Sequence, residues 1–238
     1  MRKRNRQKKK QWRQRLVLCL AVATTLCTLA VVGIVVPHVG NLMAFRREQA
    51  MLPNYSPFDD VWREINPDYV GWIRINGTTV DYPVVRGRDN VQYLTMSFSG
   101  EENILGAIFM DYRLELDTPN LVIYGHQARD EAGTRLMFGG LFYFRDNDAE
   151  LLENYSTIEF MENGMLHKFE IFSARQTDIF DPGYQIRFET PLAFELFLRR
   201  IGAPYDTTQV ITLSTCIGHN NDRRFIVQGA LVSSTEVH

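Results

Sequence analysis

The polarity of the chain changes abruptly near its N-terminus. Residues 1–15 carry nine Lys or Arg and no acid, and residues 16–36 are then 21 positions without a charge. An apolar helix of that length spans about 30 Å at about 1.5 Å per residue, which matches the hydrocarbon thickness of a bilayer. The pattern therefore predicts a transmembrane helix over 16–36 that Pro37 ends.

The cations beside this helix set its expected orientation. The positive-inside rule makes residues 1–15 a cytoplasmic basic tail and places the chain after Pro37 outside. A cleaved signal peptide is the alternative, although its apolar region is usually about 7–15 residues long and precedes a small-x-small site. A basic nucleic-acid-binding arm is a further alternative, which the adjoining apolar helix disfavours. We therefore expect an uncleaved, single-pass anchor that contacts the lipid bilayer of the cell membrane.

Beyond residue 57 the hydrophobic positions fall into short runs bounded by turn residues, a pattern typical of strands. The Asn76-Gly77 and Asn163-Gly164 pairs separate two pairs of runs and indicate hairpins. The predicted strands cover 71–75, 78–85, 106–112, 120–126, 156–161, 165–176, 209–216 and 224–232, and the predicted helical segments cover 58–65, 91–94, 137–144, 148–154 and 192–201. The pattern predicts a mostly β domain with peripheral helices, in which eight strands close into an antiparallel or mixed barrel, because closure removes exposed edges.

Domain organisation and charge narrow the choice of partners. Residues 37–57 are interpreted as a short stalk, and 58–238 as one extracellular domain with room for a core. After residue 15 the chain has 17 Lys and Arg against 28 Asp and Glu. This acidic balance argues against a nucleic-acid partner. The sequence shows no cluster of Cys, His or carboxylates at metal-ligand spacing, so we expect no metal or other cofactor.

The cysteines point to one position. Cys19 and Cys27 lie inside the predicted transmembrane helix, so Cys216 is the one thiol in the predicted extracellular part. A lone thiol there has no intramolecular disulfide partner, which leaves intermolecular pairing, a reactive thiol or an inert buried side chain. Cys216 ends an apolar run, at the lip of a predicted strand.

A reactive thiol needs a proton donor and a group that stabilises an oxyanion. His126 ends its predicted strand as Cys216 ends its own, and neighbouring strands that finish at one rim would bring the two together. His219, three residues after Cys216, is the alternative proton donor. Arg224 begins the next strand and returns to that rim, where a guanidinium can hold an oxyanion. Arg223 would point to the opposite face by strand alternation.

Several stretches together resemble the sortase family. TLSTC followed by an arginine and an apolar strand, with LVIYGH, resembles the sortase signature. Similarity to the class B subgroup extends over INPDYVGWIRINGTTVDYPVVRGRDNVQYL (65–94), GAIFMDYR (106–113), MFGGL (137–141) and the helical segment at 190–201. The resemblance covers 58–232 and implies an eight-stranded sortase-type barrel in a membrane-anchored cysteine transpeptidase of Gram-positive surfaces. It assigns the nucleophile to Cys216, the catalytic histidine to His126 and the catalytic arginine to Arg224.

The resemblance also implies a substrate and a groove for it. Asn90, Leu94, Tyr184 and Ser214 match groove-lining positions for a sorting-signal peptide, although Leu94 and Tyr184 can equally be packing residues. The implied reaction cleaves the peptide at a Thr carbonyl, forms a thioester on Cys216, and transfers the acyl group to an amine of a peptidoglycan precursor. A pilin polymerase that uses a Lys amine, a cysteine hydrolase that uses water, and a non-catalytic binding module are the alternatives.

Overall fold

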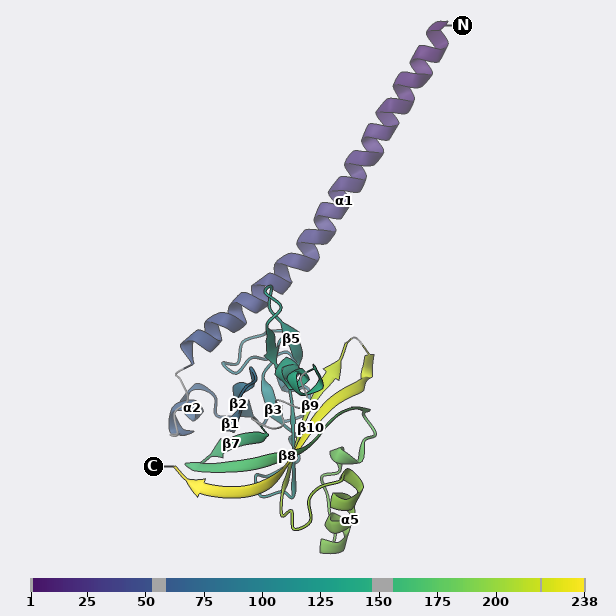
Figure 1. Cartoon of the computed structure of the whole chain (residues 1–238). Coiled ribbons are helices and arrows are strands. Elements are labelled where there is room, and N and C mark those ends of the chain that lie inside the picture. Colours follow the sequence, from purple (N-terminus) through teal and green to yellow (C-terminus); the bar gives the residue numbers. More distant parts are fainter. Residues whose placement is uncertain (1, 53–58, 147–155, 219, 238) are drawn as a thin grey trace. The chain divides into compact units, whose positions relative to one another are not determined.

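The computed structural model describes residues 2–52, 59–146, 156–218 and 220–237 (Figure 1). The chain divides into two compact units, Met1–Arg46 and Arg47–His238, and each is described by itself. The predicted helical segment at 148–154 and the alternative proton donor His219 lie outside the described residues.

The first unit is helical. The helix α1 (Arg2–Met51) is continuous and contains Pro37, so the expectation that Pro37 ends the helix is wrong. Proline removes only one backbone donor and crowds the preceding turn, and the Asn41 amide donates to the Pro37 carbonyl oxygen at 2.7 Å. Much of the expected stalk is therefore helical. Within the described part of the chain, Gln14–Ala50 is the one helix long and apolar enough to cross a membrane.

The second unit contains a closed barrel with the strand order β1-β2-β3-β4-β9-β10-β8-β7 (Figure 1). Its strands are β1 (Tyr69–Ile75), β2 (Asp81–Val85), β3 (Ile108–Met110), β4 (Asn120–Tyr124), β7 (Thr157–Glu162), β8 (Met165–Asp178), β9 (Val210–Ile217) and β10 (Asn220–Glu236). Two neighbouring pairs, β2–β3 and β4–β9, are parallel, and the others are antiparallel. The predicted eight-stranded mixed barrel is confirmed, and each predicted strand forms part of it.

Turn chemistry explains the hairpins. Asn163 and Gly164, between β7 and β8, have φ values of 48° and 75°, as a two-residue type I′ turn requires. The β1–β2 connection passes through Gly77 and is longer than predicted, because β2 begins at Asp81.

A separate two-stranded sheet, β5 (Gln127–Arg129) and β6 (Arg135–Met137), was not predicted. Its strands are too short to show an alternating pattern.

The helices pack around the barrel. They are α2 (Asp59–Ile65), the 3-10 helices η1 (Gln92–Leu94), η2 (Phe138–Phe142) and η3 (Pro182–Tyr184), and the α-helices α3 (Tyr143–Asp146) and α5 (Pro191–Ile201). Trp62 of α2 is fully buried, and its ring centroid lies 4.7 Å from that of Trp72 in β1. In η2, Phe142 stacks on Phe225 of β10 with 5.0 Å between centroids. Thr190 caps α5 by accepting the Ala193 N–H. Of these contacts, the Phe142–Phe225 stack lies directly beside Arg224, a residue of the candidate site.

Candidate active site

The candidate site begins where β4 and β9 end. These strands are parallel, with Tyr124 opposite Ser214, and the Gly125 N–H donates to the Ser214 carbonyl oxygen at 3.2 Å. His126 and Cys216 each follow this pair by two residues. Because side chains alternate along a strand, residues two positions further on return to the same face. The two side chains therefore lie at one rim of the barrel, where both line the same groove.

Arg224 reaches the same rim from β10, although that strand begins at Asn220 and not, as predicted, at Arg224. It lies directly opposite Cys216 in the antiparallel β9–β10 ladder. Opposed residues have Cα atoms about 4.5–5.5 Å apart and side chains on one face. The neighbouring Arg223 is exposed and donates to the Gln176 side chain at 3.0 Å. The register therefore places Arg224, and not Arg223, beside the thiol.

These side chains line one groove. The groove has a volume of about 290 Å³, and Cys216 in its wall is a half-buried free thiol. Tyr184 lies at its side, with the hydroxyl oxygen 2.7 Å from Ser214 Oγ. The predicted residues that line the groove are Asn90, Leu94, His126, Ser214, Cys216 and Arg224. The structure thus gathers these six predicted site residues around one cavity, and Tyr184 contacts two of its lining residues, Ser214 and Tyr124.

The ring of His126 has a fixed partner. Its Nε2 lies 2.8 Å from the Leu94 carbonyl oxygen at the end of η1. A proton on Nε2 makes this contact a hydrogen bond and leaves Nδ1 as the ring atom that can exchange a proton with a group in the groove. Leu94 thus contributes its backbone, in addition to its side chain, to the site.

A buried carboxylate lies behind the groove. The Asp111 side chain has no exposed surface and accepts hydrogen bonds from the Asn90 amide at 2.8 Å, the Tyr124 hydroxyl at 3.2 Å and the Arg113 guanidinium at 2.7 Å. Burial raises the pKa of Asp111, but the hydrogen bonds from Arg113 and Asn90 outweigh burial and hold that pKa below its ordinary value. Asp111 is therefore ionised at neutral pH, and its carboxylate orients the Asn90 side chain by accepting the hydrogen bond from the Asn90 amide. Sequence analysis missed this residue, and its one signal was an acid directly after an apolar run.

Tyr184 is held as a neutral phenol. Burial raises its pKa to about 12, although the hydrogen bond to Ser214 and the charge of Arg224 act in the opposite direction. Its ring stacks on that of Tyr124, with centroids 6.5 Å apart and planes 17° apart. At neutral pH the hydroxyl can therefore donate to Ser214, and the ring supports Tyr124, which lines the groove.

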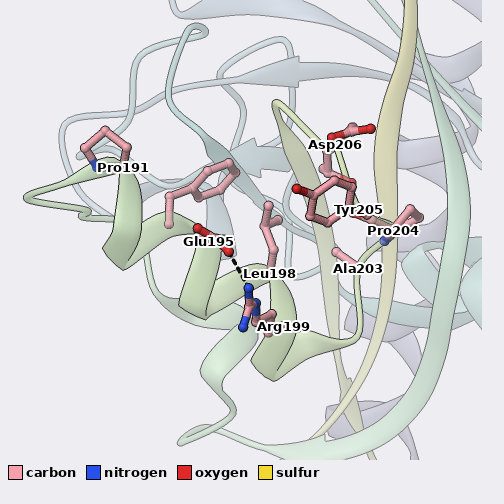
Figure 2. Close-up of a pocket in the computed structure, with 10 residues that line it drawn as sticks. Pro191, Glu195, Leu198, Arg199, Ala203, Pro204, Tyr205 and Asp206 are labelled. Carbon is pink, nitrogen blue, oxygen red and sulfur yellow. Dashed lines mark hydrogen bonds and ion pairs between the residues drawn. The ribbon is translucent and has the colours of Figure 1, made fainter.

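A second hollow lies along α5 and the segment that follows it (Figure 2). Its volume is about 340 Å³, and its lining includes Leu198, Tyr205 and the Glu195–Arg199 ion pair of 2.5 Å. It shares no lining residue with the groove at Cys216. In the described ranges of the chain, no group of three or more His, Cys, Asp or Glu side chains can hold a metal ion.

The geometry defines a class of chemistry. A thiol with a histidine on the neighbouring strand and an arginine opposite it supplies the nucleophile, proton donor and oxyanion partner that cysteine-dependent acyl transfer needs. The chain matches the Sortase domain family over residues 73–232, and it belongs to the sortase family of cysteine transpeptidases.

Individual relatives place it within that family. The chain is 33% identical over 187 residues to sortase B of Staphylococcus aureus, a match that covers 74% of this chain and 72% of that protein. Among solved structures it is similar to Clostridium perfringens sortase B, with a TM-score of 0.65, 28% identity, and coverage of 74% of this chain and 100% of that one. The Staphylococcus aureus sortase B–substrate complex aligns with a TM-score of 0.64 and 29% identity over 81% of this chain and 91% of that one. The chain is a class B sortase.

Proposed function

We propose that this enzyme cleaves a sorting-signal peptide at a Thr carbonyl and transfers the acyl group to an amine of a peptidoglycan precursor. The observation that carries the proposal is the placement of Arg224 opposite Cys216, with His126 at the end of the adjoining parallel strand. The likeness to a sortase B solved with substrate supports a peptide in this groove.

The first step forms a tetrahedral adduct. The Cys216 thiolate attacks the Thr carbonyl carbon, a C–S bond forms, and an electron pair moves onto the carbonyl oxygen. Arg224 projects from the opposing strand on the same face and donates N–H groups to this oxyanion. A planar guanidinium suits this role because it remains charged throughout the neutral pH range.

The second step releases the first product. The C–N bond breaks as His126, in its imidazolium form, donates a proton to the departing nitrogen, which leaves a thioester on Cys216. An amine then attacks the thioester, passes its proton to His126, and displaces the Cys216 thiolate. The sequence of steps regenerates the starting enzyme and needs no cofactor.

The proposed location follows from α1. Residues 16–36 cross the cell membrane once and contact the lipid bilayer, the basic tail stays cytoplasmic, and the catalytic domain lies outside. The apolar composition of Gln14–Ala50 supports this arrangement. It places the groove where secreted proteins and wall precursors are found.

The test is mass spectrometry of the detergent-solubilised full chain, incubated with a panel of sorting-type peptides with and without an amine. We expect an acyl adduct on Cys216 that the amine converts into an amide product. The Cys216→Ser variant should bind peptide and form no adduct, because a hydroxyl has no comparable anionic fraction near neutral pH.

Each alternative predicts a different product. A hydrolysed peptide whose yield the amine leaves unchanged would indicate a cysteine hydrolase. A product formed with a pilin Lys amine but not with a peptidoglycan-type amine would indicate a pilin polymerase. Peptide binding with no adduct in the wild-type chain would indicate a non-catalytic binding module.

A further inference from the structure

Three polar side chains lie buried side by side on neighbouring barrel strands. Asn120 in β4, Thr212 in β9 and Gln228 in β10 have no exposed surface. Thr212 Oγ1 donates to Asn120 Oδ1 at 2.9 Å, and Gln228 Nε2 donates to Thr212 Oγ1 at 3.0 Å. Burial of polar groups costs free energy unless they are hydrogen-bonded, so these bonds are needed for the strands to pack.

At one end of this hydrogen-bonded series, the Asn120 amide contacts the segment that contains η3. Asn120 Nδ2 donates to the backbone carbonyl oxygens of Gly183 and Gln185, at 2.8 Å in each case. Both amide protons of a barrel residue are thus committed to the η3 segment. The carbonyl groups have the amide as their partner only while this segment stays against β4.

The other end closes through β8. Arg175 donates to Gln228 Oε1 at 2.7 Å and to Asp181 Oδ1 at 2.8 Å, and Asp181 Oδ1 also accepts the Gly183 N–H at 2.7 Å. The bonds form a closed circuit, the polar ring, through Asn120, Thr212, Gln228, Arg175, Asp181 and Gly183. A Cβ at Gly183 would lie 2.8 Å from Gln228 Nε2, so the segment sits directly on the ring.

The residue after Gly183 is Tyr184, which packs against two residues of the groove wall, Ser214 and Tyr124. Its hydroxyl oxygen lies 2.7 Å from Ser214 Oγ, two residues before Cys216. Cys216 and Arg224 are close enough to Tyr184 for their charges to act on it. Because Gly183 belongs to the polar ring and Tyr184 is the next residue, the ring fixes the backbone that carries the Tyr184 side chain.

We propose that the polar ring is a positioning device that fixes Tyr184 against Ser214 and Tyr124 and thereby holds in place the part of the groove wall that these two residues form. Its members are positioning residues, since Asn120, Gln228, Arg175 and Asp181 act on the peptide through Tyr184. A fully satisfied network of directional hydrogen bonds makes a segment more rigid than apolar contacts do. Rigidity matters here because a small displacement of the residues that position a substrate lowers the reaction rate. The inference rests on the proposed function, because it assumes that a peptide occupies the groove.

The test inverts the polarity of one ring member without changing its shape. Asn120→Asp replaces the two donated protons by a carboxylate oxygen that repels the carbonyl oxygens of Gly183 and Gln185. We expect kcat/KM for peptide acylation to fall about 10- to 100-fold, mainly through KM. Alkylation of Cys216 by iodoacetamide should keep its wild-type rate, because the small reagent does not need the groove wall.

Gln209→Glu is the matched control. The Gln209 amide also donates to two loop carbonyl oxygens, those of Leu116 at 2.8 Å and Thr118 at 2.9 Å. It precedes β9, at the opposite end of that strand from Cys216, so the same inversion should leave KM for the peptide unchanged. A rise in KM that Gln209→Glu reproduces would show a general loss of folding and overturn the proposal.

A double variant tests the route through Tyr184. Tyr184→Phe removes the hydroxyl that meets Ser214, so its effect and that of Asn120→Asp should not add when both are present. Fully additive losses would overturn the proposal. If Asn120→Asp fails to fold, Asp181→Asn decides by the same measurements, because it changes a ring member in the loop outside the barrel strands. Wild-type KM in the folded variant contradicts the positioning role.

The two proposals fail in different ways. A wild-type chain that forms no thioester with any peptide would overturn the proposed function. The polar ring is then tested by hydrogen exchange at the amides of residues 183–185, which Asn120→Asp should accelerate and Gln209→Glu should not. Unchanged exchange in the Asn120→Asp variant would overturn the ring as a clamp on η3.

Discussion

Replacement of Arg224 tests the groove chemistry most directly, because its neighbour Arg223 has the same side chain on the other face of the strand. Arg224 lies opposite Cys216, whereas Arg223 donates to the exposed Gln176. Loss of one preorganised donor to an oxyanion costs about 10²–10³ in rate, or about 2.7–4 kcal/mol. The Arg223 hydrogen bond is exposed and lies outside the groove, so its contribution, typically about 0.5–1.5 kcal/mol for a hydrogen bond, is to folding and not to the rate of acylation. We therefore expect Arg224→Ala to slow acylation at least ~100-fold and Arg223→Ala to leave it within about twofold of wild type.

The assay is a single-turnover measurement at saturating peptide, quenched at intervals and read as the fraction of acylated Cys216 by mass spectrometry. Arg224→Lys keeps the positive charge but loses the planar fork, so its rate should lie between those of the wild type and Arg224→Ala. Thermal melts of all variants, compared with that of the wild type, test whether each variant is folded. A larger fall for Arg223→Ala than for Arg224→Ala would refute the assignment of the oxyanion contact.

Three further predictions concern the acid, the anchor and the buried carboxylate. His126→Ala should leave Cys216 open to alkylation while peptide transfer stops, since the leaving nitrogen lacks its proton donor; retained turnover would mean that another group supplies the proton. Protease treatment of intact protoplasts should remove the catalytic domain and spare the basic tail, whereas a domain that is cut only after lysis would reverse the proposed orientation. Because the folded pKa of Asp111 is below its ordinary value of about 3.9, its carboxylate contributes stability that is full above that value and lost as pH falls through the folded pKa. Denaturant melts from pH 6 to pH 3 should therefore show a steeper loss for the wild type than for Asp111→Asn, and equal slopes would contradict this role.

The local pattern of the sequence determined the strands and much of the site. Alternating runs and the Asn163-Gly164 turn gave the barrel strands because side-chain period and turn conformation depend on neighbours in the chain. The same runs predicted Cys216 and Arg224 at strand ends: β9 does end one residue after Cys216, but β10 begins at Asn220, so Arg224 lies inside its strand. Local pattern failed at Pro37, where one missing donor did not interrupt a long helix, and at β5–β6, whose strands are too short to show a period.

Only the tertiary structure decided which strand ends meet. The parallel pairing of β4 with β9 places His126 beside Cys216, and it depends on the closure of the barrel over many intervening residues. The polar ring was also absent from the sequence pattern, because a polar side chain such as Asn120 or Gln228 in a strand is ordinarily interpreted as facing solvent. Closure buries these side chains and supplies their partners from β8, β9 and the η3 segment. Periodicity reports which face a residue occupies relative to its neighbours in the chain, whereas packing between distant segments decides what covers that face.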